Sequence, residues 1–318
     1  MQHILNHAHR WGLILAGGDG VRLRPPTRLL SGDERPKQYC SLVGGGTLLA
    51  RTRHRVARSI SEGRTLFVVL GAHEPFYKKE LGNVPPDRVI VQPSNCGTFP
   101  ATLHSLMLIR QRDENAVVGI FPSDHHYTEE ERFLAGIDLA FAGAEAHSSV
   151  VLMGAAAKRA ASDYSWIEAE ASKSGQGQTG ILRVKRFWEK PSPEVAEDLL
   201  RRGCIWNTFV MIGRVQAFLE IIHRAAPELY EIFEPLWQQD PLERMNAMNS
   251  TYEEMAPADF SRLVLSGAQA NRLGVFSLGD VGWTDLCDPR RVMSGLPQSV
   301  VKEKWSMLWP VTAMPEAS

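Results

Sequence analysis

Residues 13–28 read L-I-L-A-G-G-D-G-V-R-L-R-P-P-T-R and residues 35–38 read R-P-K-Q, and this stretch decides the fold. An apolar run leads directly into three glycines within four residues. Glycine lets the backbone approach a ligand closely, and successive free N–H groups can form a concavity that binds anions. Arg22 and Lys37 would add full charges to that concavity. The stretch therefore predicts a buried strand followed by a loop that holds the phosphates of a nucleotide.

The whole chain has an ordinary globular composition, with 44% hydrophobic and 22% charged residues among 318. Lys plus Arg total 35 and Asp plus Glu total 36, so we expect neither nucleic acid nor a membrane surface as a partner. The four cysteines form no Cys-x-x-Cys pair, which argues against a zinc site or a disulfide framework. We find no signal-peptide core and no apolar run of 18 residues, and we expect a cytoplasmic protein.

Short apolar strands alternate with helices along the first half of the chain. The predicted strands cover residues 11–16, 65–70, 89–92, 116–121 and 149–155. The predicted helices cover residues 47–59, 74–81 and 98–110, and a further helix follows residue 128. This alternation predicts βαβ units and an α/β fold with a mostly parallel, twisted sheet that carries helices on both faces, as in Rossmann-like proteins.

The pattern changes from about residue 160. Residues 172–180 have low complexity and are predicted to form the tip of a hairpin between residues 166–168 and 181–184. Further helices are predicted at residues 193–202, 215–224 and 227–238, and a late strand at 273–278. Because we find neither a linker nor a repeat, we expect one catalytic domain, residues 1–292, followed by a tail, 293–318, without an assigned role.

Five short motifs agree in type and order with those of a known family. They are the Gly-rich segment 15–23 with R-P-K-Q, F-P-S-D-H at 121–125, F-W-E-K-P at 187–191, C-I-W-N-T at 204–208 and G-W-T-D at 282–285. Together they resemble the sugar-phosphate nucleotidyltransferases, and the Trp-Asn and Trp-x-Asp segments with the pair Asp259-Phe260 are most similar to the bacterial mannose-1-phosphate guanylyltransferases. The resemblance covers about residues 11–292.

The resemblance implies a glycosyltransferase-A-like fold with a nucleotide half at about 11–155 and a sugar and metal half at about 156–292, the second carrying the hairpin and helical extension. It also implies attack by a sugar-1-phosphate on the α-phosphorus of a nucleoside triphosphate, with release of pyrophosphate. The implied substrates are GTP and mannose-1-phosphate, and the implied cofactor is Mg²⁺, with Mn²⁺ as an alternative. A homodimer is left open.

By the same resemblance, the loop glycines and Arg22 would hold the β- and γ-phosphates, and Lys37 would reach the α-phosphate. Residues 92–98 resemble the loop that contacts the nucleobase. The implied nucleotide-binding residues are Leu15, Ala16, Gly17, Gly18, Gly20, Arg22, Lys37, Gln92, Pro93, Gly97 and Thr98. The residues to which the family implies catalytic roles are Arg22, Lys37, Asp124 and Lys190.

The sugar and metal ends are implied in the same way. Glu189 would accept hydrogen bonds from sugar hydroxyls and Lys190 would pair with the sugar phosphate, while Tyr164 and Asn207 would be further sugar-phosphate contacts. Asp124 and Asp285 would bind the metal. Each of them ends a predicted strand, and the C-terminal ends of strands in a parallel sheet converge on the ligand crevice. Two carboxylates there suit Mg²⁺.

Several alternatives stay open. A dinucleotide-binding fold also begins with a Gly-rich turn, but Leu23 stands where its third glycine would be. Asp285 could instead pair with Arg290 or Arg291, and His125 and His126 are expected to be solvated or at the edge of the core. Compared with the family pattern, the segment around Cys96 lacks the Arg-Asn or Asn-Arg pair often found there. Ser165 and Cys287 each stand where the family often has a glycine. These departures leave open another base or sugar, or a nucleotide-sugar-binding homologue with impaired catalysis.

Overall fold

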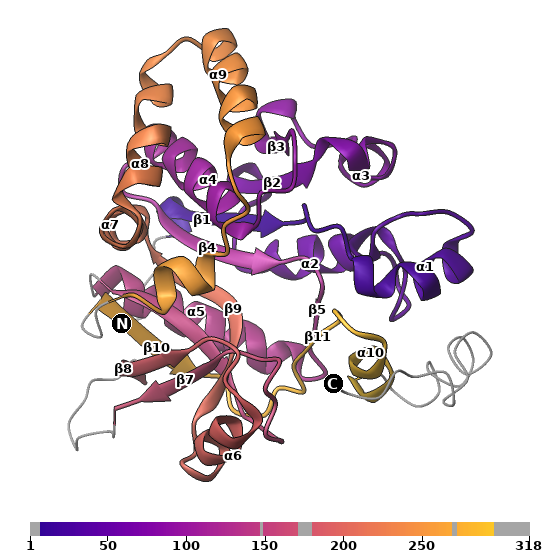
Figure 1. Cartoon of the computed structure of the whole chain (residues 1–318), viewed down its shortest axis with the longest axis vertical. Coiled ribbons are helices and arrows are strands. Elements are labelled where there is room, and N and C mark those ends of the chain that lie inside the picture. The colour runs from indigo at the N-terminus through magenta and orange to yellow at the C-terminus, as the bar shows by residue number, and fades with distance from the viewer. Residues whose placement is uncertain (1–6, 147–148, 171–179, 269–271, 296–318) are drawn as a thin grey trace.

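The computed structural model describes residues 7–146, 149–170, 180–268 and 272–295. At its centre is one sheet of nine strands, in the order β3-β2-β1-β4-β9-β6-β10-β8-β7 (Figure 1). These strands are β1 (Arg10–Leu15), β2 (Thr65–Leu70), β3 (Val89–Gln92), β4 (Val117–Pro122), β6 (Val150–Ala155), β7 (Trp166–Ala169), β8 (Ile181–Trp188), β9 (Ile205–Arg214) and β10 (Leu273–Ser277). The predicted hairpin tip, apart from Gly180, and the tail from residue 296 lie outside the described residues.

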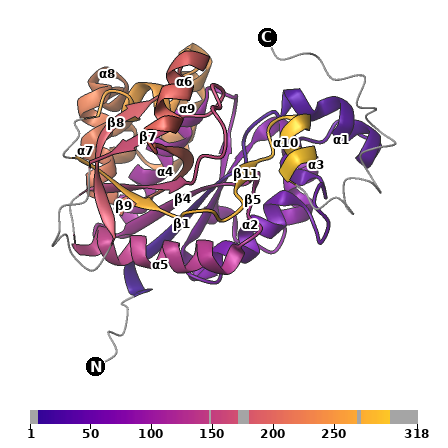
Figure 2. The same cartoon turned by 90° about the horizontal axis from the view of Figure 1, so that it is seen from below.

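Helices cover both faces of this sheet, as predicted. They are α1 (Arg24–Ser31), α2 (Leu48–Val56), α3 (Glu74–Leu81), α4 (Thr98–Arg112), α5 (Glu130–Ala146), α6 (Pro193–Arg201), α7 (Val215–Ala225), α8 (Pro227–Phe233), α9 (Pro241–Glu254) and α10 (Pro289–Gly295). In Figure 2, α5 runs along one face of the sheet, while α4 and α7 lie on the other. None of the helices in the described ranges combines the length and the apolar character that crossing a bilayer requires.

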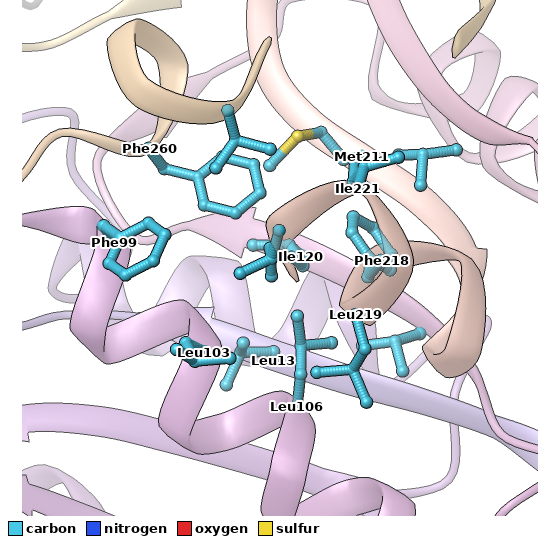
Figure 3. Packing of buried hydrophobic residues seen from close by; sticks show 14 of the residues in the cluster. Leu13, Phe99, Leu103, Leu106, Ile120, Met211, Phe218, Leu219, Ile221 and Phe260 are labelled. Atoms are coloured by element: carbon cyan, nitrogen blue, oxygen red, sulfur yellow. The ribbon is translucent and has the colours of Figure 1, made fainter. Parts of the chain in front are cut away.

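Each face of the sheet has its own hydrophobic core, and β1 contributes to both. Leu13 packs on the face that carries α4, α7 and α8, among residues such as Phe99 and Phe218 (Figure 3). The next residue, Ile14, packs on the opposite face with residues of α2, α3 and α5. A strand buried on both faces has a continuous apolar sequence rather than an alternating one, which is why the run before the glycines marks it so clearly.

The sheet is parallel where β3, β2, β1 and β4 are neighbours, and β6 and β10 are also parallel. Between these two groups lies β9, which runs antiparallel to both β4 and β6. The hairpin of β7 and β8 closes one edge of the sheet and includes the predicted strands at 166–168 and 181–184. The Rossmann-like, glycosyltransferase-A-like α/β fold is thus confirmed, and two strands run antiparallel to their neighbours: β9 at the centre of the sheet and β8 near one edge.

Two short strands outside the main sheet bring distant parts of the chain together. These are β5 (His125–His126) and β11 (Thr284–Asp285), which pair antiparallel with His125 opposite Asp285. The amide of Leu286 also donates a hydrogen bond to the carbonyl oxygen of Asp124, at 2.9 Å. The two aspartates predicted to bind metal are therefore tied to each other through the backbone, although 161 positions separate them (285 − 124).

Candidate active site

The loop after β1 is shaped by contacts with the R-P-K-Q segment. Gly20 has φ +59, and a Cβ atom there would lie 3.3 Å from the backbone nitrogen of Lys37. The buried Gln38 side chain donates hydrogen bonds through Nε2 to the carbonyl oxygens of Ala16, at 2.9 Å, and Gly18, at 2.8 Å. Gln38 thus fixes two carbonyl oxygens at the start of this loop, a role that was not predicted from the sequence.

Lys37, which is buried, and Asp124, which is half-buried, form an ion pair just after the end of β4. The Lys37 Nζ atom lies 2.6 Å from Asp124 Oδ2 and 2.8 Å from the Cys287 sulfur, which lies 3.2 Å from the same carboxylate oxygen. Burial alone would lower the pKa of Lys37, but the neighbouring Asp124 and Cys287 outweigh it and raise that pKa. Burial would likewise raise the pKa of Asp124, and the Lys37 ammonium holds it well below its usual range. The pair is therefore fully charged at neutral pH.

Asp285 lies at the end of β11, where it contacts Arg291 and accepts a hydrogen bond from the Tyr164 hydroxyl at 3.3 Å. Arg291, from α10, also pairs with Asp163, and its guanidinium lies 4.1 Å from the centre of the Tyr164 ring. The pairing of Asp285 with Arg291 that the sequence left open is confirmed. Asp285 is not on the surface, however, since its side chain is only 18% exposed.

The residues predicted for the sugar phosphate come from the segment just before β7, from β9 and from the turn after β8. Ser165 donates a hydrogen bond to Glu189 at 2.5 Å, and Lys190 Nζ lies 3.5 Å from the other oxygen of the same carboxylate. The Asn207 side chain accepts a hydrogen bond from the backbone N–H of Phe209 at 3.2 Å. The serine that replaces a glycine thus orients the glutamate expected to contact the sugar.

Two residues in this region have a costly backbone conformation. Among the described residues, the non-glycine residues with positive φ are Lys190, at 42°, and Phe209, at 59°. Such conformations cost about 1–3 kcal/mol each and tend to occur at functional sites, where the surrounding structure enforces them. Both residues line the cleft described below, so the strain is concentrated where a ligand would be bound.

The segment predicted to contact the base packs against the chain near residue 259. Gln92 Nε2 donates to the Tyr252 hydroxyl at 3.1 Å, and Thr98 Oγ1 accepts from the backbone N–H of Phe260 at 2.9 Å. A Cβ atom on Gly97 would lie 2.4 Å from the carbonyl oxygen of Ala258. These contacts hold the Asp259-Phe260 motif beside residues 92–98, the segment predicted to contact the base.

A single cleft of about 430 Å³ joins these parts. The predicted residues that line it are Leu15, Gly17, Gly18, Lys37, Gln92, Gly97, Thr98, Asp124, Tyr164, Glu189, Lys190, Asn207 and Asp285. The predicted residues outside the lining are Ala16, Gly20, Arg22 and Pro93. Arg22 is exposed on a short 3₁₀ turn, Val21–Leu23. The sequence thus predicted most of one cleft, and the individual roles stay predictions.

Other lining residues had no predicted role. Asp163, Ser165, Phe209 and Cys287 line the cleft, and Arg291 reaches it through Asp285. Ser165 and Cys287 stand where the family pattern has glycine, so the sequence singled them out but did not indicate what they do. His125 and His126 are both buried, and His125 lines the cleft.

Asp124 and Asp285 alone would supply only some of the oxygen ligands that a hard divalent cation needs. Among the described residues, no group of three or more His, Cys, Asp and Glu side chains could hold a metal ion. Mg²⁺ does not need such a group, because it keeps several waters and takes further ligands from substrate phosphates. Asp124 and Asp285, which line the same cleft, suit that kind of binding.

Comparison with known proteins gives relatives of moderate similarity. The chain is 28% identical over 224 residues to the alginate biosynthesis protein AlgA of Pseudomonas fluorescens, covering 69% of this chain and 44% of the relative. It is 26% identical over 282 residues to mannose-1-phosphate guanylyltransferase 2 of Escherichia coli O157:H7, covering 86% of this chain and 57% of the relative. The chain thus spans about half the length of these curated relatives.

Among solved structures, the crystal structure of mannose-1-phosphate geranyltransferase from Thermus thermophilus is similar to this fold, with a TM-score of 0.76 and 25% identity. The match covers 90% of this chain and 79% of that one. The family model described as nucleotidyl transferase matches residues 11–294, which include the loop, both aspartates and the whole lining of the cleft. The chain belongs to the nucleotidyl transferase family.

Proposed function

We propose that this protein transfers a nucleotidyl group from a nucleoside triphosphate to a sugar-1-phosphate. A phosphate oxygen of the sugar-1-phosphate attacks the α-phosphorus, the bond from that phosphorus to the oxygen bridging the β-phosphorus breaks, and pyrophosphate leaves. The observation that carries the proposal is the Lys37–Asp124 ion pair in a cleft that Gly17, Gly18, Glu189 and Lys190 also line. This reaction depends on positioning and charge stabilisation, which such a cleft supplies.

At the phosphate end, Lys37 is the charged donor. Because its pKa is raised, it stays protonated while negative charge develops on the transferring phosphate, and a donor fixed in a buried site needs little reorganisation. Gln38 holds the carbonyl oxygens of Ala16 and Gly18, so the loop can present N–H groups to a phosphate. These contacts support a triphosphate at this end of the cleft.

Asp124 and Asp285 are the residues that would hold Mg²⁺, for which Mn²⁺ is the alternative. When bound, the metal would supply positive charge that stabilises the phosphate oxygens and the leaving group. Each carboxylate contacts a cationic side chain, Lys37 for one and Arg291 for the other. We infer that metal and triphosphate would bind together, because the phosphates would give Lys37 a new anionic partner if Asp124 held the metal.

For the two substrates we propose GTP and mannose-1-phosphate. The support comes from the relatives named as mannose-1-phosphate guanylyltransferases and from the Trp-Asn and Trp-x-Asp segments of this chain. Gln92 and Thr98, proposed to contact the base, and Glu189 and Asn207, proposed to contact the sugar phosphate, all line the cleft. The cysteines Cys40, Cys96, Cys204 and Cys287 are free thiols, which suits the reducing cytoplasm that we propose as the location.

The proposal is tested by measuring pyrophosphate release from each pairing of the common nucleoside triphosphates with a set of sugar-1-phosphates. We expect release above background, and most of it with GTP and mannose-1-phosphate. A different best pair would change the substrates and keep the reaction. Tight nucleotide-sugar binding without release on any pair would instead show a homologue with impaired catalysis.

Two variants connect this activity to the cleft. Asp124→Asn and Lys37→Met should each lower kcat/KM by about 10²–10³-fold, the usual loss when one charged or donor group of a preorganised site is removed. Asp198→Asn and Lys79→Met are matched controls, because both side chains are exposed on helices away from the cleft. Retention of full activity in the first two variants, with pyrophosphate release measured as above, would contradict the proposed mechanism.

A further inference from the structure

The Gly-rich loop after β1, residues 17–20, contains one carboxylate, which belongs to Asp19 between Gly18 and Gly20. Its Oδ2 atom accepts a hydrogen bond of 2.7 Å from Nδ2 of Asn95, a residue 76 positions later in the chain. Its Oδ1 atom lies 3.4 Å from Nε2 of His73, a buried residue that follows β2. Both oxygens of this carboxylate are therefore in contact with side chains from other elements.

Asn95 belongs to the segment predicted to contact the base, residues 92–98, which we call the base segment. Its Oδ1 atom accepts a hydrogen bond from the backbone N–H of Gly97 at 3.2 Å. The base segment is fixed in turn by residue 258, because the backbone N–H of Ala258 donates to the carbonyl oxygen of Cys96 at 2.9 Å. The Asn95 side chain thus forms a bridge between the Gly-rich loop and the base segment.

The loop and the base segment also touch at a second point. A Cβ atom on Gly17 would lie 2.9 Å from Oε1 of Gln92, so the backbone of the loop passes close to this side chain. Gly17, Gly18, Gln92 and Asn95 all line the catalytic cleft, whereas Asp19 is not part of its lining. The Asp19 carboxylate is thus turned towards Asn95 and His73 and not into the cleft.

A carboxylate in this loop is unexpected on electrostatic grounds. The triphosphate proposed to bind at the loop is strongly negative, and like charges that lie close together repel each other. A carboxylate without a structural task would therefore weaken triphosphate binding. The contact with Asn95 supplies such a task, because an ionised acceptor makes a stronger hydrogen bond than a neutral one.

We propose that Asp19 is a positioning residue, which ties the Gly-rich loop to the base segment through Asn95. The inference rests on the triphosphate binding proposed above. The tie holds the two parts that meet the phosphates and the base of one nucleotide in a fixed relative position. A site that is ordered before its ligand arrives binds more tightly, because less conformational freedom is lost on binding.

The test compares two substitutions at the same position. Asp19→Ala removes both the charge and the acceptor, whereas Asp19→Asn removes the charge but keeps an oxygen that can accept from Asn95. The probe is whichever of ATP, CTP, GTP and UTP the parent protein binds most tightly, measured by calorimetry with Mg²⁺. We expect Asp19→Ala to weaken its binding about fivefold, the usual effect of one hydrogen bond, and Asp19→Asn to bind at least as tightly as the parent protein.

Asn95→Ala removes the other partner of the same hydrogen bond and should weaken binding by a similar factor. The double variant of Asp19→Ala and Asn95→Ala should bind little more weakly than either single variant, because both substitutions break one tie. Asp87→Ala is the matched control, since Asp87 is an exposed carboxylate that pairs with Arg112 and does not line the cleft. It should bind the probe as the parent protein does.

Three results would overturn the proposal. They are tighter binding by Asp19→Ala than by the parent protein, equal losses for Asp19→Ala and Asp19→Asn, and additive losses in the double variant. In the pyrophosphate assay, Asp19→Ala should raise KM for the nucleotide and leave KM for the sugar-1-phosphate unchanged, a split that a general loss of structure would not produce. Absence of pyrophosphate release by the parent protein would contradict the transfer reaction alone, because the calorimetric comparison needs no turnover.

Discussion

His104, in α4, is a residue whose charge should affect stability. Loss of hydration and the nearby Arg244 guanidinium lower its pKa from 6.5 to about 4. Below pH 6.5 the unfolded chain binds a proton at this position and the folded chain does not. The free energy of unfolding is therefore unaffected by His104 above pH 6.5. It falls between pH 6.5 and 4, by up to about 1.4 kcal/mol per pH unit, as protonation favours the unfolded chain.

We expect His104→Gln to flatten the fall in unfolding free energy between pH 6.5 and 4. Urea unfolding at several pH values in this window measures the slope for the variant and the parent protein. The matched control is His54→Gln, which removes an exposed histidine from α2 and should leave the slope unchanged. Equal slopes for His104→Gln and the parent protein would show that His104 titrates alike in the folded and unfolded chains.

At the same scale, the sequence predicted the chemistry of the cleft better than its contacts. Lys37, Asp124 and Asp285 were assigned from motifs, and the structure brings all three to one cleft. Arg291 was named as a possible partner of Asp285, but the contact of Cys287 with Lys37, across 250 positions of the chain, was not predicted. Only packing decides such contacts, and no local pattern records it.

At the scale of elements, the loop before β11 depends on a close approach between backbone and side chain. Gly282 has φ +59, and a Cβ atom there would lie 1.6 Å from Thr128 Oγ1. Gly279, in the same loop, has φ +65, but the nearest atom to its Cβ would be 3.6 Å away. Alanine would therefore strain the backbone at either position, but only at Gly282 would its methyl group also clash with Thr128.

We predict that Gly282→Ala destabilises the protein more than Gly279→Ala does. Left-handed backbone costs a residue with a side chain about 1–2 kcal/mol in either variant. The clash with Thr128 should add about 1–3 kcal/mol for Gly282→Ala alone. Urea unfolding measures both losses, and equal losses would mean that the loop moves away from Thr128 without cost.

Most elements of the first half were predicted closely, because each is a short apolar strand or an amphipathic helix with turn residues at its ends. The strands at 65–70 and 89–92 and the helix at 74–81 match the structure residue for residue. No strand was predicted at β9, and no helix was predicted at α1, α9 or α10. The strand β9 was missed because the motif C-I-W-N-T, at its start, was recognised only for its chemistry. The neighbours of β9 in the sheet, β4 and β6, lie far away in the sequence, so no local pattern indicated the pairing.

At the scale of the whole molecule, the two functional halves share one sheet. Residues 205–214 of the predicted sugar half form β9, which lies between β4 and β6 of the predicted nucleotide half. The division at about residue 155 stays a prediction about function, since the strands on either side of β9 hydrogen-bond to it. Neither half can complete its sheet alone.

We therefore expect heat to unfold the described part of the chain in one cooperative transition. Differential scanning calorimetry should give a calorimetric enthalpy close to the van't Hoff enthalpy, which is the test of all-or-none unfolding. Separate expression of residues 1–155 should give a chain without a cooperative transition. Two resolved transitions in the full protein would show instead that the halves are independently stable.

The central position of β9 also has a consequence during protein synthesis. As the chain leaves the ribosome from its N-terminus, β4 and β6 emerge with the slot between them empty, and it stays empty until residue 214 has been made. Unpaired strand edges of this kind can pair with other chains. Between the synthesis of residue 155 and that of residue 214, the nascent protein thus has two unpaired strand edges that are hydrogen-bonded to β9 in the folded protein.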